Sequence, residues 1–178
     1  GSDTLATSYI LSSAVKAIEE KEGLKFDLIF CGKQAIDGDT AQVGPQTAEK
    51  LGLPQISYVD DVLEFSKEKI VVKKALENNY EVLECPLPCV ITTLSTIAKP
   101  RYMRVMGISH AFEKDVTIKT FDDLNIDPAI IGLKGSPTKV KKTFTKEVHS
   151  NSDILNLDGK SSARKVAEIL MDMNFIGK

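Results

Sequence analysis

The feature that most limits how this chain can fold is an apolar segment followed directly by a polar, glycine-containing loop and a helical pattern. The apolar segment is residues 26–31 and the helical pattern is residues 46–51. This order predicts a buried strand, a turn, and a helix whose first backbone N–H groups point at one anionic group. Gly32, Gly38 and Gly44 are expected to provide conformations or close approaches that a Cβ would hinder. We interpret the loop as a cradle for phosphate or pyrophosphate.

The cradle does not match the common nucleotide-binding motifs. No Gly-Lys-Ser/Thr closes it, and it lacks the Gly-x-Gly-x-x-Gly pattern of dinucleotide-binding folds. Loops of this kind are also ordinary connectors between a strand and a helix. Asp37 and Asp39 suit either a metal or the backbone N–H groups of a turn, and we favour the turn. Gln42 can donate to a phosphate oxygen or simply pack.

The remaining pattern predicts helices around buried strands, followed by an antiparallel meander. In chain order the expected elements are a helix at 5–22, strands at 26–31, 56–65, 69–76, 80–84 and 89–93, short helices at 45–51 and 107–114, a helical turn at 121–124, and a final amphipathic helix at 163–173. Asp3 is expected to cap the first helix and Ser161-Ser162 the last. The first helix should bury a stripe that includes Leu5, Leu11 and Ile18.

Together these elements predict the α/β class, with a doubly wound parallel sheet that carries an antiparallel addition. The continuous apolarity of residues 26–31 predicts a strand buried on both faces. We expect residues 1–137 to form the α/β domain and residues 138–178 a C-terminal arm and helix. The chain opens with a helix, although a doubly wound fold normally begins with a strand, so we expect an N-terminal part of the fold to be absent from it.

Composition excludes several classes of partner and compartment. The net charge of −2 argues against nucleic acid and anionic membrane surfaces, and no apolar run is long enough for membrane insertion. Three cysteines without paired spacing favour a reducing, cytoplasmic location over a disulfide scaffold. Cys85 and Cys89 are expected to be buried thiols. His110 and His149 have no companions at ligand spacing, so we expect no metal site.

Two further segments have both a functional and a structural interpretation. Thr4 and Thr7 lie three residues apart near a helix N-terminus, where their hydroxyls can meet an anion or serve only as a cap and an ordinary helix residue. Residues 100–106 place Tyr102 and methionines among arginines, which is typical of a protein-docking surface but equally of a partly buried loop.

Residues 26–55 resemble the signature region of the β subunit of electron transfer flavoprotein. The resemblance includes the Gly-Lys-Gln-Ala-Ile-Asp core, the following Gln and Gly, and the Leu-Gly-Leu-Pro-Gln exit. Pro86-Leu-Pro88, Lys99-Pro-Arg-Tyr102 and the segment 132–138 are similar in order and spacing. The resemblance covers essentially the whole chain and implies that roughly the first third of the subunit is missing.

This resemblance implies an adenine-nucleotide-binding β subunit that pairs with a homologous α subunit. The α subunit's flavin exchanges electrons with dehydrogenases. The β subunit holds a structural AMP or, in electron-bifurcating members, a second FAD that accepts hydride from NADH. The phosphate contacts fall on Ala35, Gly38, Ala41, Gln42 and Val43. The full set of implied cofactor-binding residues is Asp3, Thr4, Ala6, Thr7, Cys31, Gly32, Ala35, Gly38, Asp39, Thr40, Ala41, Gln42, Val43 and Gly44.

The resemblance also favours the bifurcating type. AMP-type members often carry Asn and Thr where this chain has Ala41 and Val43, and residues 3–7 are similar to the bifurcating segment near the second flavin's diphosphate. The loop that docks acyl-CoA dehydrogenase maps onto residues 100–108, with Val105 at an anchor position where leucine is common. The implied partner-binding residues are Pro100, Arg101, Tyr102, Val105 and Met106.

The leading hypothesis is therefore the β subunit of a bifurcating electron transfer flavoprotein that binds FAD. The first alternative is a non-bifurcating β subunit with AMP in the same site. The second is a stand-alone sensor domain for adenine nucleotides, without electron transfer. In the leading hypothesis no side chain has to act as a general acid or base, because the flavin carries the chemistry.

Overall fold

The computed structural model describes residues 1–145, 152 and 154–177. The chain divides into two compact units, residues 1–140 and 141–178. None of the described helices is both long and apolar enough to span a bilayer.

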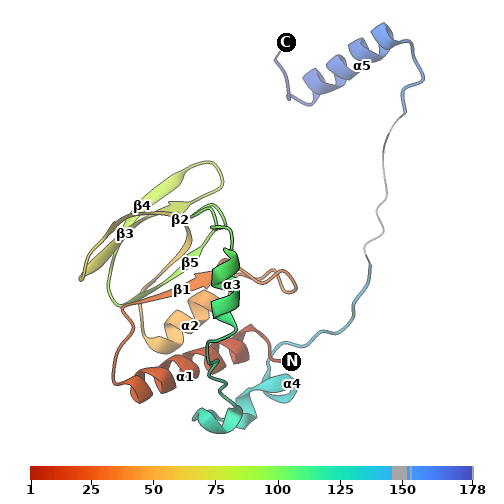
Figure 1. The fold of residues 1–178 in the computed structure, drawn as a ribbon. Coiled ribbons are helices and arrows are strands. Elements are labelled where there is room, and N and C mark those ends of the chain that lie inside the picture. The colour runs from red at the N-terminus through yellow and green to blue at the C-terminus, as the bar shows by residue number, and fades with distance from the viewer. Residues whose placement is uncertain (146–151, 153, 178) are drawn as a thin grey trace. The chain divides into compact units, whose positions relative to one another are not determined.

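The first unit is built on one mixed sheet of five strands in the order β1-β5-β2-β3-β4 (Figure 1). The strands are β1 Leu28–Gly32, β2 Gln55–Phe65, β3 Lys69–Ala75, β4 Tyr80–Pro86 and β5 Cys89–Thr93. β1, β5 and β2 run parallel, whereas β3 and β4 continue the sheet in antiparallel fashion. The α/β class and the antiparallel meander that the sequence predicts are confirmed.

β2 belongs to both halves of this sheet. Its first residues pair in parallel with β5, with Ile56 opposite Ile91, and its later residues pair antiparallel with β3. A register shift interrupts the pairing with β5 between Ile56 and Val59. Tyr58 lies inside that shift and has a φ of 61°, in the left-handed region.

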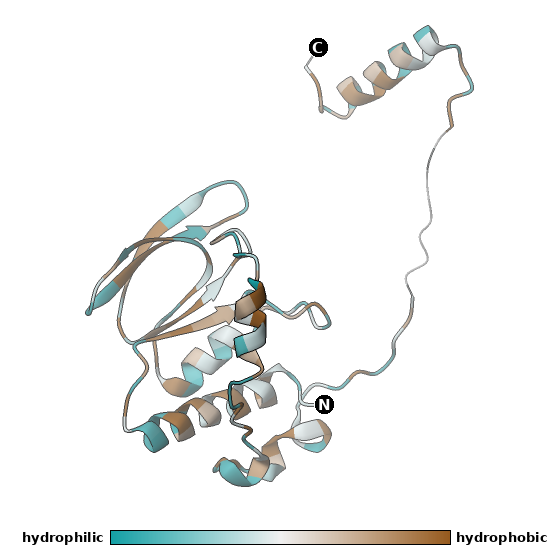
Figure 2. Ribbon diagram, viewed as in Figure 1, coloured by the Kyte–Doolittle hydropathy of each residue, from teal (hydrophilic) through white to brown (hydrophobic). Residues whose placement is uncertain are grey.

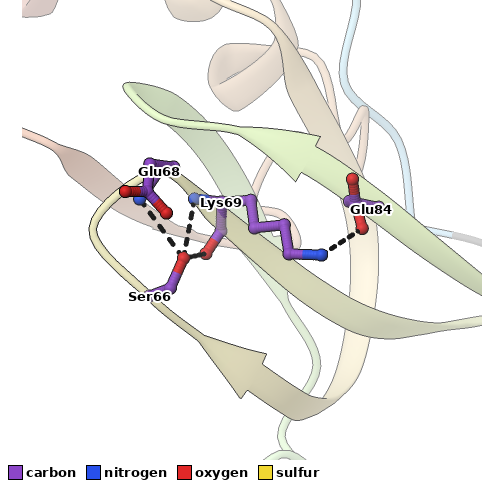
Figure 3. A network of polar contacts seen from close by, with 4 residues as sticks. All are labelled: Ser66, Glu68, Lys69 and Glu84. Carbon is purple, nitrogen blue, oxygen red and sulfur yellow. Dashed lines mark hydrogen bonds and ion pairs between the residues drawn. The ribbon is translucent and has the colours of Figure 1, made fainter.

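The turn between β2 and β3 is closed by side chains (Figure 3). The Ser66 hydroxyl accepts hydrogen bonds from the backbone N–H groups of Glu68 and Lys69, each at 3.2 Å. The Lys69 ammonium then donates to Glu84 on β4 at 2.7 Å. Residues 66–68 therefore form a closed turn, and an ion pair ties β4 to the start of β3.

The hydrophobic core is formed by buried side chains of the sheet strands and includes two of the three cysteines. Val59, Ile70, Val72 and Ile91 are fully buried together with Cys89, and Cys85 is nearly so. Burial, with the Cys85 thiol beside it, raises the pKa of Cys89 to about 12. Cys85 and Cys89 are free thiols in the core, as the sequence predicts.

Two helices are stacked on one side of the parallel strands. α2, Val43–Leu51, packs on β5, and α1, Thr4–Glu22, packs on α2 (Figure 1). The predicted apolar stripe of α1 is wrong in part, because Leu5, Leu11 and Ile18 are exposed while Ala6, Ser8 and Ser12 are buried. The other predicted members, Ile10, Ala14 and Val15, are half-buried. The small buried residues suit a close helix–helix contact. The two serine hydroxyls donate to carbonyls of α1 itself, at 2.8 and 2.9 Å.

β1 also differs from its prediction as a strand buried on both faces. It is an edge strand, paired only with β5, and Phe30 remains 59% exposed. Continuous apolarity predicted a central position because parallel strands are usually covered on both sides.

The rest of the first unit consists of short helices. They are α3 Val105–Ala111, η1 Phe121–Asp123, η2 Pro128–Ile130 and α4 Gly132–Gly135. The segment after α4 returns to the start of α1, where the Thr138 N–H and hydroxyl donate to the Asp3 carboxylate at 2.9 and 2.6 Å.

The second unit contains α5, Gly159–Asp172. Its N-cap is Asp158, whose carboxylate accepts the N–H groups of Lys160 and Ser161. The predicted cap at Ser161-Ser162 is therefore wrong by one turn. Among the described apolar side chains of α5, Val166 and Ile169 are exposed, whereas Ala167, Leu170 and Met171 are half-buried.

Candidate functional site

The candidate site lies at the carboxyl ends of β1 and β5, where open α/β sheets bind their ligands. The chain leaves β1 at Lys33 and returns as α2 at Val43. The Lys33 N–H donates to the Thr93 carbonyl at 3.1 Å, and the Leu94 N–H donates to Val59 at 2.9 Å. These bonds fix the ends of the three parallel strands beside the loop.

Gly44 allows α2 to begin in contact with the sheet. A Cβ on Gly44 would lie 2.4 Å from Thr92 Cγ2 and 3.3 Å from Cys31 Cβ. Thr92 is buried, and burial also raises the pKa of the Cys31 thiol. The close approach predicted for Gly44 is therefore confirmed.

The same prediction is wrong for Gly32 and Gly38. Neither has a left-handed φ, and a Cβ at either position would meet nothing within 4 Å. The left-handed residues of the loop are instead Asp39, with φ 50°, and Ala41, with φ 53°. Non-glycine residues in this region are uncommon and cluster at ligand-binding loops.

In the first part of the loop, two backbone N–H groups find acceptors within the loop itself. The Asp39 N–H donates to the Ala35 carbonyl at 3.0 Å, and the Asp37 carboxylate accepts the Gly38 N–H at 3.0 Å. The Gln34 amide donates to the Asp39 carboxylate. The turn role is thus confirmed for Asp37, whereas Asp39 binds a side chain.

The second part of the loop and the start of α2 present unused donors. Among the described residues, the backbone N–H groups of residues 40–44 donate to no acceptor. No acidic residue lies in the first turn of α2. Consecutive amides beside left-handed residues form an anion-binding concavity, and the helix dipole adds to it. The residues present therefore fit a phosphate or diphosphate group.

The start of α1 joins this loop. The Thr4 hydroxyl donates to the Gln42 side-chain oxygen at 2.9 Å, so the two predicted cofactor segments meet. Asp3 is the N-cap of α1, as predicted, because its carboxylate accepts the Ala6 N–H at 2.9 Å. That bond, followed by those from Thr138, holds the pKa of Asp3 below its usual value. Thr7 is half-buried and donates its N–H to the Asp3 carbonyl.

The sequence interpretation missed three residues at this edge of the sheet. Thr92 touches Gly44, its hydroxyl accepts the Tyr58 N–H at 3.1 Å, and the Lys33 ammonium lies 5.6 Å from the centre of the Tyr58 ring. Lys33 belongs to the Gly-Lys-Gln motif, so there was a reason in the sequence to consider it. The alternation of apolar and polar residues in β2 gives no indication that Tyr58 has a left-handed backbone conformation.

The predicted docking segment is exposed. Pro100, Arg101 and Tyr102 precede α3, whereas Val105 and Met106 begin it. All of these side chains are exposed, so the alternative of a partly buried loop is wrong for them. Figure 2 shows that α3 carries apolar residues.

An open cavity of about 980 Å³ lies beside this segment. Its lining combines three cations with an aromatic ring and consists of Lys99, Pro100, Arg101, Tyr102, Arg104 and Gly107. None of the three cations forms an ion pair with another described residue.

The described residues contain no cluster of His, Cys, Asp and Glu side chains that could hold a metal ion. His149, one of the two histidines considered in the sequence, lies outside the described residues.

Known proteins are similar to this chain over most or all of its length. Residues 1–124 match the family described as Electron transfer flavoprotein domain. "Electron transfer flavoprotein subunit beta" of Clostridium acetobutylicum is 45% identical over 99% of this chain. "Acryloyl-CoA reductase electron transfer subunit gamma" of Anaerotignum propionicum is 42% identical over 99% of it, and "Caffeyl-CoA reductase-Etf complex subunit CarD" of Acetobacterium woodii is 39% identical over 87%.

The chain covers 65%, 66% and 57% of the lengths of these three relatives. Its sheet, its cradle and its matched residues 1–124 all agree with the family assignment. The chain belongs to the electron transfer flavoprotein β-subunit family.

Proposed function

We propose that this chain is the nucleotide-binding part of a β subunit in a heterodimeric, electron-bifurcating electron transfer flavoprotein, and that FAD occupies the cradle. The observation that carries this proposal is the set of unused N–H groups at residues 40–44, which offers donors to a diphosphate. The names of two relatives, an acryloyl-CoA reductase electron transfer subunit and a caffeyl-CoA reductase complex subunit, support a role linked to CoA substrates.

In this proposal the residues of the chain bind and orient the cofactor. The amides at the start of α2 hold the diphosphate, Thr4 fixes the Gln42 side chain, and Gly44 lets the helix approach it. The flavin, when bound, supplies the hydride and electron chemistry, with NADH as donor. The enzymatic activity would belong to the complex with the α subunit.

The alternative occupant is AMP, which would serve only to stabilise the β subunit. Ala41 argues against it, since the side chain is small and leaves room beside the amides for a larger ligand. Asn tolerates left-handed backbone, so the Asn that AMP-type members often carry at this position would fit the observed φ of 53°. Ala41→Asn therefore tests the choice without straining the loop.

We expect the heterodimer of this subunit with its α subunit to release two FAD and no AMP. Native mass spectrometry of the intact complex, with chromatography of the released nucleotides, measures this directly. The Ala41→Asn/Val43→Thr variant should shift the β site from FAD towards AMP. One FAD and one AMP per wild-type heterodimer would show that the bifurcating assignment is wrong, while leaving the nucleotide cradle in place.

We also propose that residues 100–106 dock acyl-CoA dehydrogenase and that residues 138–178 pack on the α subunit in the cytoplasm. The docking proposal draws on the exposed apolar side chains and the cationic cavity beside them. The exposed apolar side chains of α5, Val166 and Ile169, support the second. A free-standing sensor would have no use for either surface.

Val105→Asp should raise the KM for the dehydrogenase about 30-fold, because an interface anchor contributes about 2 kcal/mol. Val105→Leu should leave the KM unchanged or lower it. The matched control is Val116→Asp, since both valines are 81% exposed and Val116 lies outside the proposed docking segment. Reduction of an artificial acceptor should be unchanged in all three variants. Equal KM values for Val105→Asp and Val116→Asp would rule out this docking segment.

A further inference from the structure

We infer that Lys33 supplies the positive charge of the nucleotide site and that Tyr58 is the positioning residue that holds it there. This inference rests on the proposed nucleotide cradle and assigns two residues outside the set implied by the resemblance. It starts from the most unusual backbone conformation in the sheet.

Tyr58 is held in a conformation that bulky residues rarely adopt. Its φ of 61° falls inside the register shift between Ile56 and Val59. The Tyr58 N–H leaves the strand ladder and donates to the Thr92 hydroxyl at 3.1 Å. Irregularities of this kind re-aim a side chain and occur beside functional sites. The bond to Thr92 thus helps to hold the backbone in this conformation.

The ring lies under the Lys33 ammonium. Lys33 Nζ is 5.6 Å from the ring centre, within the range of a cation–π contact. Lys33 follows β1 and Tyr58 lies on β2, with β5 between these strands, so the lysine side chain crosses the carboxyl end of β5. Its ammonium forms no ion pair with any described residue, and a positive charge is therefore left for a ligand.

Thr92 connects this charge to the cradle. Its methyl group touches Gly44 in the first turn of α2, and its hydroxyl accepts the Tyr58 N–H. Tyr58 and the unused amides of α2 are therefore neighbours of the same buried threonine. A phosphate on those amides would have the Lys33 ammonium at the same edge of the sheet. Charge-assisted contacts of this kind are stronger than neutral ones.

The test uses AMP as the ligand, because FAD contains an AMP moiety. AMP is titrated into the nucleotide-free heterodimer by calorimetry at several salt concentrations. Lys33→Met should weaken binding about five-fold and remove most of its salt dependence, whereas Lys33→Arg should bind as the wild type does. Lys67→Met is the matched control, because it removes the same charge from the turn between β2 and β3. Equal dissociation constants for Lys33→Met and Lys67→Met would overturn the assignment of Lys33.

A double-mutant cycle tests the positioning role of Tyr58. Tyr58→Phe keeps the ring and should bind normally, while Tyr58→Leu should weaken AMP binding about two-fold. In the Lys33→Met background Tyr58→Leu should add no further loss. A further loss there would show that Tyr58 acts through the fold and would overturn its positioning role. If the wild type does not bind AMP, the proposed nucleotide cradle itself is refuted, and so is the assignment of Lys33 and Tyr58 to it.

Discussion

Gly44→Ala should lower the free energy of unfolding by about 1–3 kcal/mol, the usual cost of forcing an extra methyl group into a packed site. The new Cβ would lie 2.4 Å from Thr92 Cγ2, and α2 must move away from β5 to relieve the overlap. Because the same movement displaces the amides of residues 40–44, nucleotide affinity should fall as well. Urea denaturation of the chain measures the first effect and calorimetry the second.

Two further variants identify the overlap as the cause. Gly38→Ala adds the same methyl group where nothing lies within 4 Å and should be nearly neutral. Thr92→Ser removes the methyl group in question but keeps the hydroxyl that accepts the Tyr58 N–H. Gly44→Ala should therefore cost less in the Thr92→Ser background. If Gly44→Ala proves as stable as Gly38→Ala, the contact between α2 and β5 is not as tight as described.

Ile91→Ala should destabilise the chain by about 2–5 kcal/mol, because it removes a fully buried side chain from the middle of the sheet. Ile91 lies on β5 and pairs with Phe30 of β1 on one side and Ile56 of β2 on the other. Ile91→Val keeps most of the volume and should cost about 0.5–1.5 kcal/mol. Urea denaturation monitored by circular dichroism measures both values.

The control for Ile91 is Ile36, which is fully exposed in the loop after β1. Ile36→Ala should change the free energy of unfolding by no more than about 0.5 kcal/mol. A loss at Ile91 no larger than the loss at Ile36 would mean that β5 is not the centre of the core.

The parts of the fold that depend on local pattern could be predicted from the sequence. The alternation in residues 56–65 and 69–76 predicts strands, and β3 buries the alternate residues Ile70 and Val72. In the turn between the two strands, the Ser66 hydroxyl accepts backbone N–H groups of the turn itself. The strand, loop and helix of the cradle are likewise adjacent in the chain. Local hydrogen bonding and side-chain period determine such elements.

The parts that depend on which elements meet could not be predicted. The apolar residues of α1 suggested a buried stripe, but α1 packs on α2 and its buried residues include Ser8 and Ser12. The apolarity of residues 26–31 suggested a strand buried on both faces, yet β1 is at an edge. Packing partners lie far away in sequence, and a single helical or strand period does not specify them.

For the same reason, the sequence identified only part of the candidate site. The cradle and the start of α1 were singled out from their own residues, but their meeting through Thr4 and Gln42 is a tertiary contact. Tyr58 and Lys33 were missed because their association requires the register shift in β2 and the order of three strands. The cofactor-binding and partner-binding roles of the named residues remain predictions.

β2 links the stability of the meander to that of the cradle. This one strand is the parallel neighbour of β5 at one end and the antiparallel neighbour of β3 at the other. Unfolding of the meander would remove the strand that pairs with Val59. The Val59 carbonyl, which accepts the Leu94 N–H at the end of β5, would then no longer be held in place. Melting is therefore expected to spread from one region to the other, so that both halves of the sheet open as one cooperative unit.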